Sequence, residues 1–159
     1  MTIPEATRRV VEAGRLLGFD VDIHVFPEGT KTSQDAADAI GCELAAIAKS
    51  IVLTLDDEEQ VVVFASGDTR IDLEKLADAA NGASARRATL DEARAATGFA
   101  AGGTPPFGYS SPLRIFADVA LQRHDEVWSA GGTPTTVFPI PLQTLVSLTG
   151  ATWVSVSSE

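Results

Sequence analysis

Apolar residues recur at intervals of three and four in the first segment of the chain. This spacing places them on one face of a helix. Pro4 suits the first turn of such a helix, and Gly18 suits its C-terminal cap. The sequence therefore predicts an amphipathic helix near the start of the chain, whose apolar face consists of Ile3, Ala6, Val10, Ala13 and Leu17.

Further along, short runs that alternate or are rich in β-branched residues predict strands. The two central runs, 47–55 and 60–65, are joined by the acidic turn Asp56-Asp57-Glu58-Glu59 and predict a β-hairpin. A turn at Pro27-Glu28-Gly29 ends the first predicted strand. The complete set of predicted strands is 21–26, 47–55, 60–65, 86–88, 113–118, 126–130, 135–140 and 152–156.

Capping residues mark where helices begin between these strands. Thr32 with Asp35, and Thr89 with Glu92, have the spacing of a capping box, and Asp72 can cap a third helix. The predicted helices cover 33–40, 73–80, the segment from Thr89 into Gly98, and 141–148.

The predicted strands come in clusters and do not alternate strictly with helices. This order favours an α+β fold with a mixed, mainly antiparallel sheet over a doubly wound parallel sheet. A chain of 159 residues with 45% hydrophobic content is long enough for one well-buried core. We therefore expect residues 1–159 to form a single domain.

The formal net charge of −10 favours solubility and argues against non-specific binding to nucleic acid, which needs a broad basic surface. Any contact with nucleic acid is expected to be local. The single cysteine, Cys42, and the lack of an apolar signal-peptide core or a membrane-length run predict a cytoplasmic protein without membrane contact. The candidate contacts with nucleic acid are Arg8, Arg9, Arg86, Arg87 and scattered lysines.

The stretch from Thr97 to Tyr109 combines four glycines, two prolines and three aromatic residues between a helical pattern and a strand pattern. Glycines let backbone groups approach a ligand closely, and adjacent prolines stiffen the chain. The glycine spacing is neither a dinucleotide fingerprint nor a phosphate loop. The stretch is interpreted as a rigid pocket wall lined by backbone, with a pair of packing turns as the alternative.

Lys49 is the most informative single residue, because in an extended strand it shares a face with Ile47, Ile51 and Leu53. A lysine on an apolar face snorkels to solvent, pairs with a carboxylate or meets a ligand. Asp118 is a candidate to orient Lys49 or a ligand amine, although a strand-end turn aspartate fits as well.

Other residue types exclude several kinds of site. His24 and His124 form no metal-ligand pattern with Cys42, so neither a metal site nor a cofactor is expected. The serines have no evident base and no G-x-S-x-G elbow, which argues against a serine nucleophile. Gly131-Gly132 follows a predicted strand and is a second place where backbone could meet a ligand, or a simple turn.

Taken in order, these segments resemble the YbaK and prolyl-tRNA synthetase editing-domain family. The resemblance covers roughly residues 20–156 and rests on ordered short motifs. These are Thr32-Ser33-x-x-Ala36-Ala37, Ala48-Lys49-Ser50-Ile51-Val52-Leu53, Gly67-Asp68 before Asp72-Leu73-x-Lys75-Leu76, Gly98-x-x-x-Gly102-x-x-x-Pro106-Phe107-Gly108, and Ala130-Gly131-Gly132.

The resemblance implies a free-standing aminoacyl-tRNA deacylase that hydrolyses the ester of a mischarged tRNA in trans. Its site would lie over a curved mixed sheet and use neither a metal nor a covalent nucleophile. Lys49 would anchor the terminal phosphate or the ester, and the backbone around Gly102 would hold the aminoacyl group or the adenosine 2′-hydroxyl. The other residues implied to bind substrate are Gly98, Gly103, Pro106, Ala130, Gly131 and Gly132.

Three positions depart from residues found in some family members. They are Ser50, Phe26 and Ala130, and they help to shape the amino-acid pocket. The resemblance implies a small amino acid such as alanine, cysteine, serine or threonine, with tRNA for proline a frequent acceptor. The implied partners are the tRNA acceptor end and an aminoacyl-tRNA synthetase or elongation factor.

Two alternative functions are compatible with the same predicted pocket. One is a non-catalytic module that recognises an aminoacyl end or docks on a synthetase or elongation factor. The other is a small-molecule enzyme or sensor for a nucleotide-like or amino-acid-like ligand. Multiple-turnover hydrolysis of a panel of mischarged tRNAs separates these functions from the deacylase.

Overall fold

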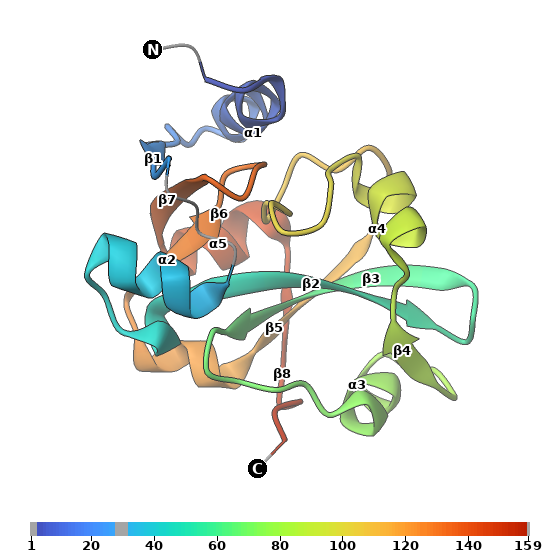
Figure 1. Ribbon diagram of the computed structural model, residues 1–159. Helices are drawn as coiled ribbons and strands as arrows, with labels where there is room; N and C mark the ends of the chain where they lie inside the picture. The colour runs from blue at the N-terminus through green and yellow to red at the C-terminus, as the bar shows by residue number, and fades with distance from the viewer. Residues whose placement is uncertain (1–2, 28–31, 159) are drawn as a thin grey trace.

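Two β-sheets lie side by side with helices around them, as Figure 1 shows for the computed structural model of the protein. The structure describes residues 3–27 and 32–158. Glu28 and Gly29 of the predicted turn lie outside the described residues. The fold is α+β, as the order of predicted elements indicates.

The larger sheet has the strand order β4-β2-β3-β5-β8. β2 and β3 form the predicted hairpin and pair along their whole length, from Ala48 opposite Ser66 to Leu55 opposite Glu59. β4 pairs antiparallel with β2, whereas β5 and β8 add parallel strands beyond β3. The bounds are β2 Ala48–Leu55, β3 Glu59–Ser66, β4 Ala85–Arg87, β5 Arg114–Asp118 and β8 Thr152–Val154.

The smaller sheet is antiparallel and has the order β1-β7-β6, with β1 at His24–Val25, β6 at Glu126–Ala130 and β7 at Thr136–Pro141. An isolated bridge between Ile47 and Trp128 connects it to the start of β2. The expected mixed and mainly antiparallel strand pairing is confirmed, but the strands divide into two sheets. Among the described residues, this bridge, just before β2, is the one backbone pairing between β6 and the β2 segment, which leaves part of the β2 edge open.

The helices begin at the predicted caps. Thr32 accepts a hydrogen bond from the Asp35 amide, and Thr89 and Glu92 form both bonds of a capping box. The α-helices are α1 Glu5–Leu16, α2 Ser33–Ile40, α3 Leu73–Ala79, α4 Leu90–Thr97 and α5 Leu142–Thr149, and two 3-10 helices, η1 Leu44–Ala46 and η2 Val119–Arg123, were not predicted. No helix among the described residues is long and apolar enough to span a membrane.

Two predicted strands are shorter in the structure. β1 is limited to His24 and Val25, which pair with β7, while Val21 and Ile23 pack against the core. β8 ends at Val154, because the amide of Val156 donates to the Asp118 carboxylate at 2.9 Å and leaves the ladder.

β3 is buried on both faces and divides the core. Val62 and Phe64 pack with Phe138 of β7 and with residues of α1 and α5. Val61 and Val63, on the opposite face, pack with Leu76 of α3 and its neighbours. Burial on both faces explains the continuous apolar run that predicted this strand.

Candidate functional site

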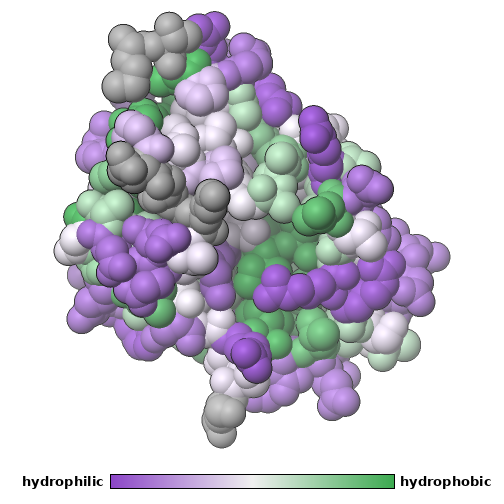
Figure 2. Space-filling model, in the orientation of Figure 1, coloured by the Kyte–Doolittle hydropathy of each residue, from purple (hydrophilic) through white to green (hydrophobic). Residues whose placement is uncertain are grey.

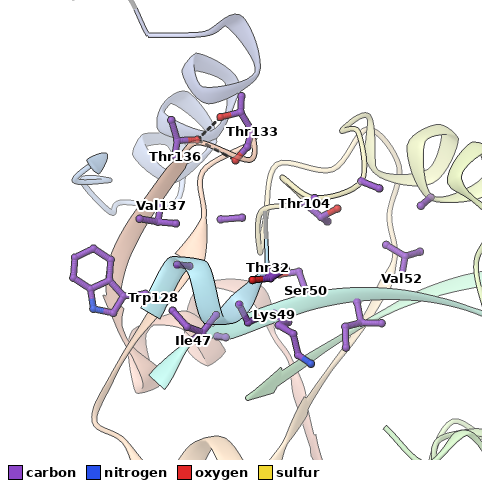
Figure 3. Close-up of a pocket in the computed structure, with 18 of the residues that line it drawn as sticks. Thr32, Ile47, Lys49, Ser50, Val52, Thr104, Trp128, Thr133, Thr136 and Val137 are labelled. Atoms are coloured by element: carbon purple, nitrogen blue, oxygen red, sulfur yellow. Dashed lines mark hydrogen bonds between the residues drawn. The ribbon is translucent and has the colours of Figure 1, made fainter. Parts of the chain in front are cut away.

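A cavity of about 390 Å³ lies beside β2, between the two sheets and the glycine-rich loop (Figure 3). Five regions distant in sequence line it: α2, β2, the junction of β4 and α4, the glycine-rich loop, and the turn between β6 and β7. The described lining residues are Thr32, Ser33, Ala36, Ile47, Ala48, Lys49, Ser50, Ile51, Val52, Arg87, Ala88, Leu90, Ala93, Ala101, Gly102, Thr104, Trp128, Ala130, Thr133, Thr136 and Val137.

The floor of the cavity is the open edge of β2. β4 pairs with β2 only from Leu53 to Leu55, and the last contact of this edge is the bond from the Ala88 amide to the Val52 carbonyl. Backbone groups alternate along a strand, so those of Ser50 point to the same edge as those of Val52. The Ser50 amide and carbonyl therefore face the cavity, where a ligand can hydrogen-bond to them.

Lys49 lies in β2 with its side chain half-buried. Its ammonium donates a hydrogen bond to the carbonyl of Thr69 at 3.0 Å and extends away from the loop that carries Thr104 (Figure 3). Burial lowers the pKa of Lys49, the nearby Arg87 lowers it further, and Asp68 opposes the shift.

Asp68 is engaged with another cation. Its carboxylate accepts bonds from both terminal nitrogens of Arg123, at 2.9 and 3.3 Å, and this hydrogen bonding holds the pKa of Asp68 below its usual value. Lys49 forms no ion pair within the described part of the chain, so its charge is available to a ligand.

The glycine-rich loop begins where α4 ends. Gly98 caps this helix with φ +81°, and its carbonyl accepts a 2.8 Å bond from Arg9 of α1. The Arg9 guanidinium also lies 4.4 Å from the centre of the Phe99 ring. These contacts explain why a glycine-rich loop keeps one conformation here. A hydrogen bond and a cation–π contact from α1 hold the first residues of the loop in place.

The loop packs backbone against backbone on the turn after β6. A Cβ atom on Gly103 would lie 2.5 Å from Cα of Thr133 and 2.7 Å from the carbonyl carbon of Gly132. Gly102, beside it, has φ +90° and faces the cavity. Glycine is thus required at 103 for close approach and favoured at 102 for backbone conformation.

The turn itself needs glycine for the same kind of reason. Gly132 has φ +101°, and a Cβ there would lie 2.8 Å from the carbonyl oxygen of Ala6 in α1. A Cβ on Gly131 would lie 2.9 Å from the side chain of Ile23. Both glycines are buried and support the wall of the cavity from behind.

Threonine hydroxyls form a polar end to the cavity. Thr7 of α1 contacts the hydroxyl of Thr136 at 3.2 Å, and Thr136 contacts that of Thr133 at 2.8 Å (Figure 3). Thr7 and Thr136 are fully buried. Sequence analysis did not find this group, because residues 129 positions apart carry no joint signal.

On the loop side, Ser50 lies next to Tyr109. Burial raises the pKa of Tyr109, a shift that the Ser50 hydroxyl opposes. The neutral phenol donates a 2.7 Å bond to the carbonyl of Pro105 and so stabilises the conformation of the loop itself.

The structure brings four predicted site residues together in the cavity wall: Lys49, Ser50, Gly102 and Ala130. Gly103, Gly131 and Gly132 lie directly behind this wall. Gly98 caps α4, and Pro106 is buried within the loop.

Phe26 and Asp118 lie outside the described lining of the cavity. The Phe26 amide donates to the carbonyl of Thr135 at 2.8 Å and continues the pairing of β1 with β7. The Asp118 carboxylate accepts bonds from the amides of Ala120 and Val156, at 3.2 and 2.9 Å. These bonds cap η2 and end β8, so Asp118 has the structural role of a strand-end aspartate.

Of the four arginines predicted to contact nucleic acid, Arg87 alone is among the described residues that line the cavity. Arg9 is bound to Gly98, and Arg8 lies 4.0 Å from Glu5 on α1. Arg86 pairs with Asp57 and Glu92. Within residues 3–27 and 32–158, no group of three or more His, Cys, Asp or Glu side chains could hold a metal ion.

The model of the aminoacyl-tRNA editing domain matches residues 27–148, which include all the regions that form the cavity. The chain belongs to the aminoacyl-tRNA editing domain family. Members of this family deacylate aminoacyl-tRNA, and this is the broad activity of the present editing domain.

Three similar proteins support the assignment. The YwhH protein of Bacillus subtilis (strain 168) is 32% identical over 112 residues, which span 70% of this chain and 71% of YwhH. The protein named "Putative Cys-tRNA(Pro)/Cys-tRNA(Cys) deacylase EbsC" of Enterococcus faecalis (strain ATCC 700802 / V583) is 22% identical over 128 residues, 80% of this chain and 78% of EbsC.

The third is a crystal structure of "a putative trans-editing enzyme for prolyl tRNA synthetase". It matches 99% of the editing domain and 100% of its own chain with a TM-score of 0.93 and 36% identity. The editing domain thus shares the whole fold of that protein.

Proposed function

We propose that this editing domain hydrolyses, in trans, the ester of a tRNA that carries a small wrong amino acid. Alanine, cysteine, serine and threonine are the candidate amino acids, and tRNA for proline is the candidate acceptor. The similarity to the trans-editing protein, at 36% identity over nearly the whole chain, supports the trans mode and the proline acceptor. EbsC, whose name includes Cys-tRNA(Pro), supports the same acceptor.

The observation that carries this proposal is the cavity along the open edge of β2. Its volume of about 390 Å³ lies within the usual range of small-ligand sites. The Ser50 backbone on its floor and the Gly102 backbone on its wall offer hydrogen bonds without bulky side chains. Such a site suits the ester and ribose of an aminoacyl-adenosine, which present several hydroxyl and carbonyl groups close together.

The ionisable side chains among the described lining residues are Lys49 and Arg87, both cations. A cation stabilises negative charge as water attacks the ester carbonyl, but a protonated amine or guanidinium cannot accept the proton that the water loses. We assign that role to the substrate, whose free adenosine hydroxyl can orient the water and pass on its proton. Lys49 holds the terminal phosphate or the ester, and the Gly102 backbone holds the aminoacyl group.

Ala130 and Ser50 shape the space for the amino-acid side chain. Ala130 ends β6 and Ser50 belongs to β2, and both residues line the cavity. The residues behind them, including Gly131 and Gly132, keep the wall in place, while Gly98 and Pro106 hold the loop. A small side chain in the substrate matches these small residues.

The test is multiple-turnover hydrolysis of a panel of mischarged tRNAs by the intact protein and by Lys49→Ala. We expect hydrolysis of at least one small aminoacyl ester and a fall of about two to three orders of magnitude in the variant, the size of losing one oxyanion donor. Lys75→Ala is the matched control, because Lys75 also donates to a backbone carbonyl, that of Ser157 at 3.1 Å, but lies outside the described cavity lining.

An unchanged rate in Lys49→Ala would remove Lys49 from the mechanism. Binding of the tRNAs without hydrolysis of any of them would instead identify a non-catalytic recognition module. Absence of binding as well would favour a small-molecule ligand.

A further inference from the structure

A second hollow of about 360 Å³ lies next to the first cavity, on the face of β2 that carries Lys49. Four aliphatic side chains and two arginines line it: Ile51, Leu53, Ile71, Leu73, Arg70 and Arg87. Figure 2 shows hydrophobic surface hollowed between hydrophilic side chains on this side of the molecule. Ile51 and Arg87 line both cavities, so the two are adjacent.

The ladder between β2 and β4 places the cations of this hollow on one face. Arg87 lies opposite Leu53, so the two side chains share a face, and alternation adds Ile51 and Lys49 to it. Arg70 directly follows Thr69, whose carbonyl binds the Lys49 ammonium. Arg70 and Arg87 thus line one apolar groove, with Lys49 on the same face of β2, in a protein of net charge −10.

Arg70 and Arg87 differ from most arginines of this protein in having no carboxylate partner among the described residues. Arg86, Arg114 and Arg123 each bind an acidic side chain at 2.7–2.9 Å. The acidic groups closest to the groove are already engaged: Asp68 binds Arg123, and Asp72 accepts bonds from the amides of Glu74 and Lys75. The two exposed guanidiniums are therefore free to bind an external anion.

We infer that this arginine groove binds the nucleotide that precedes the terminal adenosine of the substrate, with the phosphate that joins the two nucleotides on Arg70 and Arg87 and the base against the aliphatic floor. The inference rests on the proposed function, because it takes the aminoacyl-adenosine to occupy the first cavity. Single-stranded RNA is commonly held by charge on its phosphates and by apolar or guanidinium surfaces on its bases. Both kinds of surface are present in this groove.

The groove also resolves how an acidic protein can hold tRNA. A contact with one or two phosphates at the single-stranded end needs only a local cluster of cations. The rest of the surface can stay negative, and binding stays weak and sensitive to salt.

The experiment compares binding of the dinucleotide CpA with binding of adenosine, by calorimetry or NMR titration at two salt concentrations. The intact protein is expected to bind CpA more tightly than adenosine. Arg70→Gln should weaken CpA binding roughly 10-fold, as for loss of one charged hydrogen bond, and leave adenosine binding unchanged. In this variant, the slope of the logarithm of the CpA binding constant against the logarithm of the salt concentration should become shallower by about 0.7. This is the value for one phosphate contact on a single strand.

Arg94→Gln is the matched control, since it removes the same charge from an exposed arginine of α4 that lines neither cavity. Arg70→Lys keeps the charge and should retain most of the CpA affinity. Thermal unfolding of each variant checks that the fold is intact.

CpA binding in Arg70→Gln equal to that of the intact protein, or CpA bound no more tightly than adenosine, would overturn the inference. Because this readout needs no turnover, it is independent of the deacylation test. Normal ester hydrolysis with unaltered CpA binding would reject the groove alone, and the predicted CpA effect without any hydrolysis would reject the proposed function alone.

Discussion

Three neighbours of the Lys49 side chain determine its environment. β2 places it on an apolar face, the Thr69 carbonyl fixes its ammonium, and Arg87 stands near it with the same charge. The Asp68 carboxylate opposes the lowered pKa of Lys49, but Arg123 binds that carboxylate. The charge on Lys49 is thus easier to remove than that of a lysine in water.

This environment predicts the pH dependence of deacylation. If the charged ammonium assists the reaction, kcat/KM falls as pH rises through the pKa of Lys49, which lies below the usual 10.5. The fall therefore begins at lower pH than for an ordinary lysine. Rates between about pH 7 and 10, corrected for spontaneous ester hydrolysis, measure it.

Lys49→Arg supplies the control for that profile, because arginine stays charged over the whole range. The alkaline fall should disappear in this variant, whatever its absolute rate. A fall of the same shape in Lys49→Arg would assign the titration to another group.

At the scale of elements, two glycine-containing segments and one strand edge together form the cavity. The loop after α4 and the turn after β6 touch through Gly103 and Gly132, and α1 supports both, through Arg9 on the loop and Ala6 on the turn. The cavity wall is therefore as rigid as the packing of α1 against these segments.

Gly103→Ala tests this arrangement. Its methyl group would overlap the backbone of Thr133, so loop and turn must move apart, at a cost of about 1–3 kcal/mol in the free energy of unfolding. A shift of about 1 Å in the wall should lower kcat/KM about 100-fold. Chemical denaturation and deacylation assays measure the two effects.

Gly18→Ala is the matched comparison. Gly18 has φ +88°, and a Cβ there meets no atom within 4 Å. It should lose about 1 kcal/mol from backbone strain and keep full activity. Equal losses of activity in the two variants would mean that the loop–turn contact has no special part in the site.

At the scale of the whole molecule, ion pairs join segments that are distant in sequence. Arg86 of β4 binds Asp57 of the hairpin turn and Glu92 of α4, and Arg114 of β5 binds Glu59 at the start of β3. Arg86 therefore links the region over the cavity mouth to the far end of the hairpin.

This linkage predicts the acid sensitivity of the fold. Hydrogen bonds from Arg86, and then from the Thr89 amide, lower the pKa of Glu92 from 4.5 to about 2. Because the folded-state pKa is depressed, the stabilisation is complete above pH 4.5 and is lost as pH falls from 4.5 to about 2. Glu92→Gln should thus flatten the pH dependence of unfolding in this window.

Glu58→Gln removes a carboxylate from the exposed hairpin turn, where it forms no ion pair with any described residue, and serves as the charge-matched control. Denaturant midpoints measured from neutral pH to about pH 2 compare the variants. If the denaturant midpoint of Glu92→Gln fell with decreasing pH as steeply as that of the unaltered protein, the acid sensitivity would not come from Glu92.

The sequence by itself determined the order and kind of the main elements. Caps such as Thr89 and Asp72 and the apolar runs of β2 and β3 act over short distances, so their signals are visible along the chain. It also singled out Lys49 and Gly102, because a charge on an apolar face and a glycine-rich stretch are unusual locally. The division into two sheets could not be read in this way, since it depends on β6 leaving β2 after one bridge.

Tertiary structure alone decided which residues meet. Thr7 and Thr136 gained a shared role only when α1 packed on the turn after β6, and Asp118 became a cap and strand terminator when β8 came beside β5. The pairing of Arg86 and the freedom of Arg87, adjacent and chemically identical, follow from the alternation of β4, which turns one toward Glu92 and the other toward the groove. Contacts between distant segments depend on packing in three dimensions, and no local pattern encodes them.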